Sequence, residues 1–299
     1  MEERETIILD TDIGDDIDDA LCIAYLLRQG QVDVAAVTTV FQNVTEKSRL
    51  CRYLFSVGGK EAIPVYTGCP HPIGKQADEQ KALNYRFDAM ASLPGGQAGE
   101  AVAHIIRLVR ENPGKISILA IGPLTNLALA FRQAPDIVPL IRRVVIMGGA
   151  FYCHRIEWNI LCDPLAADVV FSSGVPLEAV SADVTFQCRL RLEETERIRQ
   201  AKHPLARCAA QLMDQWIACH NGAMPILHDP LAAAYLTHPE FLQMEWIHSK
   251  VETGSPMTFG MTLNLDVAAR GRYQTPLMSA SKAVDREAFV AHFLDVICG

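Results

Sequence analysis

The chain has 299 residues, of which 49% are hydrophobic and 21% charged, and its formal net charge at pH 7 is -8. A chain of this size and composition can bury a large core. The excess of carboxylates argues against a nucleic acid partner, because phosphate backbones are bound by clusters of Lys and Arg. We therefore expect a globular protein whose ligand is a small neutral or cationic molecule.

The same sequence gives no sign of export or of a membrane anchor. No apolar run is long enough to span a membrane, and the acidic start Met1-Glu2-Glu3 is unlike the basic start of a signal peptide. The nine cysteines are scattered and show no C-x-x-C spacing, which is typical of free thiols in a reducing compartment. These features predict a cytoplasmic protein without a membrane partner.

Short apolar, β-branched runs alternate with helical patterns along the chain, and a polar, Pro- and Gly-punctuated loop interrupts them at residues 70–96. The predicted strands are 6–9, 34–40, 63–66, 116–121, 144–147 and 177–182, followed by a strand-like region at 251–265. The predicted helices begin near residues 20, 45, 99, 125, 163, 192, 229 and 285. This alternation predicts one α/β domain over residues 1–299, with a doubly wound, mainly parallel (mixed) sheet flanked by helices.

An acidic stretch at residues 10–20, Asp-Thr-Asp-Ile-Gly-Asp-Asp-Ile-Asp-Asp-Ala, lies where the first predicted strand passes into the first helix. Ligands of open α/β sheets bind at the carboxyl ends of strands, so the position suggests a binding site. Asp18 or Asp19 alone is explained equally well as a helix cap. The remaining carboxylates would repel one another unless a hard cation were bound, which favours a metal site.

Further polar groups follow the later strands and are expected at the same edge of the sheet. They are Asn43, Ile121-Gly122, Met147-Gly148-Gly149, Glu157-Trp158-Asn159 and His228-Asp229. The first strand is not followed by G-x-G-x-x-G or by a P-loop, which argues against a dinucleotide or triphosphate ligand. A Ser-His-Asp hydrolase is disfavoured because its nucleophile elbow is missing.

Together these residues resemble the calcium-dependent nucleoside hydrolases, also called inosine-uridine preferring nucleoside N-ribohydrolases. Asp10-Thr11-Asp12 with Asp18-Asp19-Ala20 is similar to the acidic hallmark of that family. The later signatures occur in the family's order, as Gly122-Pro123-Leu124-Thr125-Asn126, Met147-Gly148-Gly149, Glu157-Trp158-Asn159 and His228-Asp229-Pro230. The resemblance covers nearly the whole chain and implies the nucleoside-hydrolase fold.

The resemblance implies a Ca²⁺ ion held by Asp10, Asp19, Asp229 and the main-chain carbonyl of Ile121. It also implies that Asp12 is the general base for a metal-bound water, since the cation lowers the pKa of that water. Taken alone, Asp229 is better explained as an N-cap before Pro230, and only the acidic stretch favours the ligand role.

For the substrate, the resemblance implies that Asp18, Asn43, Glu157 and Asn159 bind ribose hydroxyls and that Met147 lines the apolar side of the sugar. Asn43 and Asn159 are otherwise ordinary turn residues, and Met147 an ordinary core residue. His228 resembles the family histidine that protonates the leaving base, although a lone histidine is more often structural. Trp216 and His220, one turn apart on a predicted helix, either approach the base or pack against a neighbouring helix.

Three departures from the family pattern limit these assignments. The acidic stretch has Ile13 where proline is usual and contains the additional pair Asp15-Asp16, either of which could take over a ligand role. Residues 68–96 contain no H-G-x-x-G motif, so base recognition is expected to differ. The stretch 150–155 is short, and members of the family often have a further sugar-contacting asparagine there. His154 or Arg155 could instead contact a sugar substituent other than a free 5'-hydroxyl.

The expected reaction is hydrolysis of the N-glycosidic bond of ribonucleosides to ribose and free base, in purine or pyrimidine salvage, by a homodimer or homotetramer. One rival is a haloacid-dehalogenase-type phosphatase that uses Asp10 and Asp12 with Mg²⁺, although its later lysine and paired aspartates have no convincing counterpart. The other is a non-catalytic nucleoside or ribose binder on the same fold. Loss of Asp12 or Asp229 would mark such a binder, and both residues are present.

Overall fold

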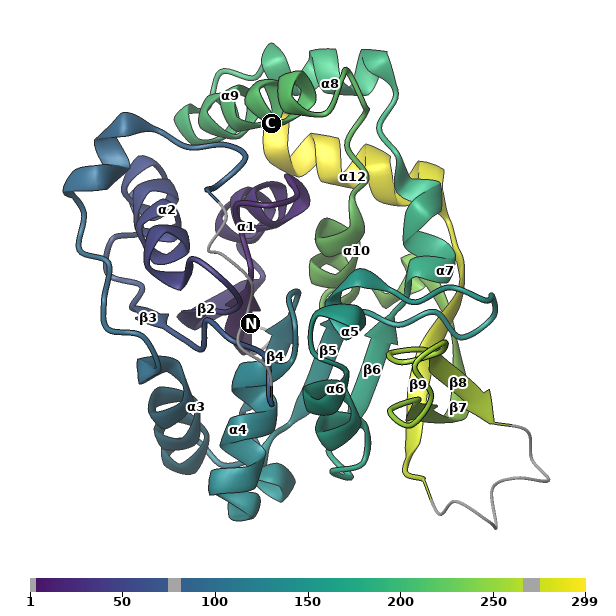
Figure 1. Cartoon of the computed structure of the whole chain (residues 1–299). Helices are drawn as coiled ribbons and strands as arrows, with labels where there is room; N and C mark the ends of the chain where they lie inside the picture. The colour runs from purple at the N-terminus through teal and green to yellow at the C-terminus, as the bar shows by residue number, and fades with distance from the viewer. Residues whose placement is uncertain (1–3, 75–81, 266–274) are drawn as a thin grey trace.

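The computed structural model describes residues 4–74, 82–265 and 275–299, and a nine-stranded sheet runs through them. The strand order is β3-β2-β1-β4-β5-β6-β9-β7-β8, which can be followed from left to right in Figure 1. Neighbouring strands are parallel from β3 to β9, while β7 pairs antiparallel with both β9 and β8. The predicted mixed, mainly parallel α/β sheet is confirmed.

The bounds of the elements follow the predicted alternation closely up to residue 241. The strands are β1 Glu5–Thr11, β2 Val32–Thr39, β3 Val65–Thr67, β4 Ile116–Ala120, β5 Arg143–Met147, β6 Leu177–Val180, β7 Leu242–Val251, β8 Thr262–Leu265 and β9 Leu277–Val284. The α-helices are α1 Asp18–Gln29, α2 Val44–Val57, α3 Glu100–Glu111, α4 Thr125–Gln133, α5 Trp158–Cys162, α6 Pro164–Phe171, α7 Ala182–Thr185, α8 Leu192–Arg199, α9 Pro204–Cys219, α10 His228–Tyr235 and α12 Arg286–Cys298. Short 3₁₀ helices lie at Asp88–Ser92, Pro135–Leu140, Phe186–Cys188 and Pro239–Phe241.

Helices cover both faces of the sheet because successive side chains of a strand point to opposite faces. In β1, Ile7 and Leu9 pack into one core with residues of α1, α2, α9, α10 and α12. Ile8 packs into the second core with residues of α3, α4 and α6. Figure 1 shows these two groups of helices on opposite sides of the strands. Among the described residues, no helix is both long enough and apolar enough to span a membrane.

The sheet places the acidic stretch at its topological switch point. From β1 the chain first adds β2 and β3 on one side, and then returns to add β4, β5 and β6 on the other. A crevice forms at the carboxyl ends of strands where the order reverses in this way. Asp10 ends the pairing of β1 with β4, opposite Ala120, so the residues that follow it enter that crevice.

The carboxyl-terminal part differs from the prediction. The strand-like region at 251–265 is not one strand, because β7 ends at Val251 and β8 begins only at Thr262. β7 was not predicted apart from its last residue, Val251. β9 was not predicted either, although it is inserted between β6 and β7. Its sequence, Leu-Met-Ser-Ala-Ser-Lys-Ala-Val, is rich in small and polar residues, and its place in the sheet comes from pairing with distant strands rather than from a strong local pattern.

Candidate active site

A cavity of about 560 Å³ opens at the carboxyl ends of β1, β4 and β5. All of the site residues predicted from the sequence line it, except Asp10 and Asn43. Those that do are Asp12, Asp18, Asp19, Ile121, Met147, Glu157, Asn159, His228 and Asp229. The fold therefore brings together residues more than 200 positions apart, as expected from their places after successive elements.

Three buried carboxylates form the floor of the cavity. One oxygen from each of Asp18, Asp19 and Asp229 lies within 4.8 Å of the others. Asp19 accepts a hydrogen bond of 2.5 Å from the Thr11 hydroxyl, and Asp18 accepts one of 3.3 Å from the main-chain N–H of Asp229. Burial, followed by the charges of neighbouring aspartates, raises the pKa of all three well above the usual value. Such a group fits a metal ion well, because the charge of a cation would offset both the burial of the carboxylates and the repulsion between them.

The positive charge that the protein itself supplies here comes from Lys47 of α2. Its buried ammonium donates a 2.5 Å hydrogen bond to the main-chain oxygen of Asp12, and its charge lowers the pKa of Asp12 and Asp19. Burial nevertheless raises the pKa of Asp12 to about 6. One ammonium does not neutralise Asp12 and the three floor carboxylates, so the donor set still favours a hard cation.

Asp10 is completely buried, does not line the cavity and is not one of the three clustered carboxylates. Its Oδ1 accepts hydrogen bonds from the Thr38 hydroxyl at 2.5 Å and from the Asn126 amide at 2.7 Å. Its Oδ2 is also buried and has no hydrogen-bond partner among the described residues. Burial is the main cause that raises the pKa of Asp10 to about 7. Oδ2 is therefore the atom through which Asp10 could reach an ion.

The Asn159 side chain links two main-chain carbonyls that lie at the ends of β4 and β5. Its amide N–H groups donate to the oxygen of Ile121 at 3.1 Å and to that of Met147 at 3.0 Å. Because a carbonyl oxygen has two lone pairs, that of Ile121 can still act as a ligand. The Asn159 Oδ1 has no hydrogen bond to the described residues and can accept one from a substrate hydroxyl.

Glu157 and Asn159 both lie at the start of the short helix α5. Glu157 is the N-cap of α5, and its carboxylate accepts hydrogen bonds from the main-chain N–H groups of Asn159, Ile160 and Gly149. Burial outweighs these bonds and raises the pKa of Glu157 to about 7. The two side chains reach the cavity from the first turn of a short helix.

His228 lines the cavity beside Asp229 at the start of α10. Its Nδ1 lies 2.6 Å from the Thr185 hydroxyl, and the edge of the Phe186 ring meets its own ring at 88°, with the centroids 5.0 Å apart. Burial, assisted by the charges of Arg189 and Arg155, lowers the pKa of His228 to about 4. The imidazole is therefore neutral at neutral pH and carries one N–H.

Asn43 lies away from this cavity, at the N-cap position of α2, and its side chain forms no capping hydrogen bond. It is partly buried, and its main-chain oxygen accepts a hydrogen bond from the N–H of Lys47. Its predicted contact with ribose stays a prediction.

The loop around Asp15-Asp16 is held by residues of the long excursion that the sequence left without a role. The Tyr85 hydroxyl accepts a hydrogen bond from the N–H of Gly14 and donates one of 2.6 Å to the carbonyl of Asp16. The Asn84 amide donates to the carbonyl of Asp15 at 2.7 Å. Asp15 and Asp16 both line the cavity.

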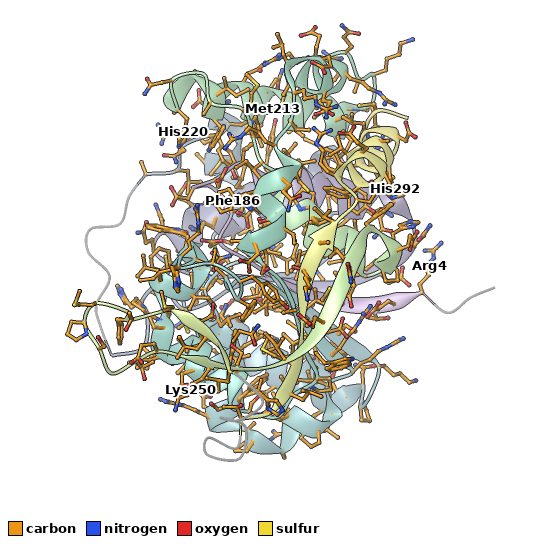
Figure 2. The ribbon with its side chains drawn as sticks, turned by 90° about the vertical axis from the view of Figure 1, so that its right-hand side faces the viewer. Arg4, Phe186, Met213, His220, Lys250 and His292 are labelled. Carbon is orange, nitrogen blue, oxygen red and sulfur yellow. The ribbon has the colours of Figure 1, made fainter. Side chains whose placement is uncertain are left out.

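Aromatic and cationic side chains form the outer wall. Trp216 and His220 both line the cavity and stack with 4.2 Å between ring centroids, and their approach to a base stays a prediction. Arg155 and Arg189 also line it. Figure 2 shows Phe186 and His220, which belong to the 3₁₀ helix after α7 and to the end of α9. Arg189 was missed because nothing in its local sequence distinguishes it from a surface arginine.

Comparison with known proteins decides the family. The family model for the inosine-uridine preferring nucleoside hydrolases matches residues 7–291. The chain belongs to this family. Its resemblance to nucleoside hydrolases, its fold and its enzyme class were thus predicted correctly from the sequence.

Curated relatives of this hydrolase include the pyrimidine-specific ribonucleoside hydrolase RihA of Shewanella baltica, which is 34% identical over 97% of this chain and 95% of its own length. The probable uridine nucleosidase 1 of Oryza sativa subsp. japonica is 32% identical over 84% of this chain and 82% of its own. Among solved structures, the purine-preferring ribonucleoside hydrolase from Gardnerella vaginalis has a TM-score of 0.82 and 28% identity, covering 99% of this chain and 98% of that one. A plant nucleoside hydrolase shares the fold with a TM-score of 0.86, covering 99% of this chain and 100% of that one at 24% identity.

Proposed function

We propose that this nucleoside hydrolase cleaves the N-glycosidic bond of pyrimidine ribonucleosides, uridine among them, with Ca²⁺ bound at the floor of the cavity. The observation that carries the proposal is the meeting of Asp18, Asp19 and Asp229 within 4.8 Å, in the same cavity as Asp12. The pyrimidine preference is supported by the names of the relatives RihA and uridine nucleosidase 1. Neither a phosphatase nor a non-catalytic binder is favoured by any of these observations.

We assign the ion to Asp19, Asp229 and the carbonyl of Ile121, with the unpartnered Oδ2 of Asp10 as a further candidate. Oxygen donors of this kind suit Ca²⁺, which takes six to eight oxygen ligands. A bound calcium ion would supply charge that lowers the pKa of a water molecule at the site.

Asp12 is proposed to take a proton from the attacking water, a role supported by its place in the same cavity as the three clustered carboxylates. Asp18, Glu157 and the free Oδ1 of Asn159 accept hydrogen bonds from ribose hydroxyls, and Met147 covers the apolar side of the sugar. These carboxylates also stabilise the positive charge that develops on the sugar in an oxocarbenium-like transition state. We give Asn43 no direct contact with ribose.

We propose that His228 contacts the leaving base as a neutral hydrogen-bond donor. When the Thr185 hydroxyl donates to Nδ1 of His228, the ring proton resides on Nε2, and that N–H is available to the base. His228 thus keeps its predicted contact with the leaving base, but it donates a hydrogen bond to the base instead of transferring a proton to it.

Salvage of nucleosides in the cytoplasm by a homodimer or homotetramer completes the proposal. All nine cysteines are free thiols, which supports a reducing compartment.

The test is release of base by purified protein that has been stripped with chelator and resupplied with Ca²⁺. We expect free base from uridine, loss of activity in the stripped protein, and recovery with Ca²⁺. The Asp229→Asn variant should bind calcium at least about tenfold more weakly, because it loses a charged ligand. The matched control Asp33→Asn changes an exposed carboxylate on β2 and should behave as wild type. Phosphate release from sugar phosphates, with no base release from any nucleoside, would refute the proposal.

A further inference from the structure

We propose that Arg155 and Arg189 stabilise the negative charge on the departing base, which makes this hydrolase selective for nucleosides whose bases leave as anions. The inference rests on the proposed function and concerns the step in which the base leaves. It assigns a role to two cavity residues outside the proposed metal and ribose sites.

Arg155 is fixed beside the position proposed for the base. It lines the cavity, and its guanidinium carbon lies 4.3 Å from the centroid of the Phe186 ring. The same Phe186 ring meets His228 edge-on, with 5.0 Å between ring centroids. A guanidinium over an aromatic face is held by cation–π attraction while its N–H groups stay free to bind an acceptor.

Arg189 reaches the same region from a backbone that is held on two sides. It forms an isolated antiparallel bridge with Ile226, and its carbonyl accepts a 2.9 Å hydrogen bond from Arg286. Its own Nη1 donates to the carbonyl of Met224 at 2.9 Å, which leaves the other guanidinium N–H groups available. Both Arg189 and Arg155 lie close enough to His228 for their charges to act on its ring.

Neither arginine forms a salt bridge with a carboxylate in the described part of the chain, unlike Arg110 and Arg199, which pair with Asp136 and Asp214. The exposed Asp16 lies within electrostatic reach of Arg189 and offsets part of its charge. The cavity is thus polarised, with carboxylates at the floor and two unpaired guanidinium groups beside His228. Both groups are exposed in this structure, and a bound base would displace water from them and so strengthen their field.

This polarity matches the charge that the reaction creates. As the bond between the anomeric carbon and the base nitrogen breaks, its electron pair goes to the base. The oxygen of water forms a new bond to the anomeric carbon and gives one proton to Asp12. The base leaves as an anion and takes a proton from solvent after release, so that atoms and charges balance. Cations placed where negative charge develops lower the energy of this transition state.

The same arrangement selects among bases. A base whose ring N–H is acidic, such as uracil, departs readily as an anion, and the two arginines assist it. A base that is more easily activated by protonation, such as cytosine, gains less, because the same positive charges oppose its protonation. The structure therefore assigns this hydrolase to nucleosides of keto bases in preference to those of amino bases.

The experiment compares Arg155→Gln, Arg189→Gln and the control Arg207→Gln, which removes an exposed charge on α9 outside the cavity. Values of kcat and KM are measured for uridine, 5-fluorouridine and cytidine. We expect each cavity variant to lower kcat for uridine by about tenfold. This loss is smaller than the one typical of a hydrogen-bond donor in an enclosed oxyanion hole, because solvent screens the charges of the exposed Arg155 and Arg189. The loss should be smaller for 5-fluorouridine, whose base is the more acidic, and smaller still for cytidine. The control should match wild type.

Equal losses on all three nucleosides, or losses confined to KM, would overturn the inference. Uridine 5'-monophosphate tests the other anion that two arginines can bind. If wild type cleaves this nucleotide faster than uridine, and the cavity variants lose only that advantage, the arginines bind a phosphate and the inference is wrong. If wild type releases no base from any nucleoside, the proposed function itself fails. Wild-type activity on uridine together with unchanged variants contradicts the inference alone.

Discussion

Asn126 ties together the carboxyl ends of β1, β2 and β3, and replacing it with alanine should destabilise the whole edge that carries the site. Its amide donates to Asp10 at 2.7 Å and to the carbonyl of Thr39 at 3.1 Å, and its oxygen accepts from the N–H of Cys69 at 2.9 Å. The side chain is completely buried. Each buried group that loses its partner costs about 1–3 kcal/mol, so Asn126→Ala should lower the free energy of unfolding by about 3 kcal/mol or more.

Urea denaturation of the metal-free protein measures this change directly. The matched control is Asn112→Ala at the end of α3, since that side chain makes one hydrogen bond, to the carbonyl of Leu108, and is only partly buried. The control should lose about 1 kcal/mol or less. If Asn126→Ala lowers the free energy of unfolding no more than Asn112→Ala does, the three buried hydrogen bonds of Asn126 do not stabilise this edge of the sheet.

Three further predictions concern the acidic loop, an ion pair of the sheet and the metal site. Tyr85→Phe removes the hydroxyl that bridges Gly14 and Asp16. It should raise KM for uridine severalfold and lower the free energy of unfolding by about 1–2 kcal/mol. An unchanged KM would show that the loop does not depend on these hydrogen bonds. Burial alone would raise the pKa of Glu5, but hydrogen bonds from Arg143 and Ser117 lower it below the usual value of 4.5. The ionised Glu5 therefore stabilises the fold at pH values above 4.5, and this contribution is lost as the pH falls through the lower pKa of the folded protein. Glu5→Gln should therefore flatten the dependence of unfolding free energy on pH below about pH 4.5, and an unaltered curve contradicts this. The floor aspartates have raised pKa values, so the metal-free protein should lose stability as the pH rises above their usual pKa of 3.8. Calcium should therefore raise Tm more at about pH 8 than at about pH 5. Equal increases in Tm at both pH values would contradict this.

The sequence predicted what depends on local pattern. Strands such as 144–147, Val-Val-Ile-Met, are continuous apolar runs followed by helical patterns, so the parallel part of the sheet and the residues at its carboxyl edge could be placed in order. Nine of the eleven site residues predicted from the sequence line the cavity. β9 could not be predicted, since its small and polar residues form a strand only by pairing with β6 and β7.

Residues that act through distant partners were also missed. Lys47 reads as an ordinary polar position of a helix, yet the turn of the chain buries its ammonium against Asp12. Tyr85 lies in an irregular segment without periodicity, and its function depends on Gly14 and Asp16, about 70 residues earlier. Asn43 also follows a strand, yet it is the N-cap of α2 and is not among the residues that line the cavity.

We propose that Asp12 activates the water that cleaves the N-glycosidic bond. The test follows uridine by NMR with calcium-loaded wild type and with Asp12→Asn at matched calcium occupancy. We expect ribose and uracil in equal amounts from wild type, and a rate lower by about a thousandfold or more in the variant. Absence of ribose with wild type, or a wild-type rate in Asp12→Asn, would contradict the claim.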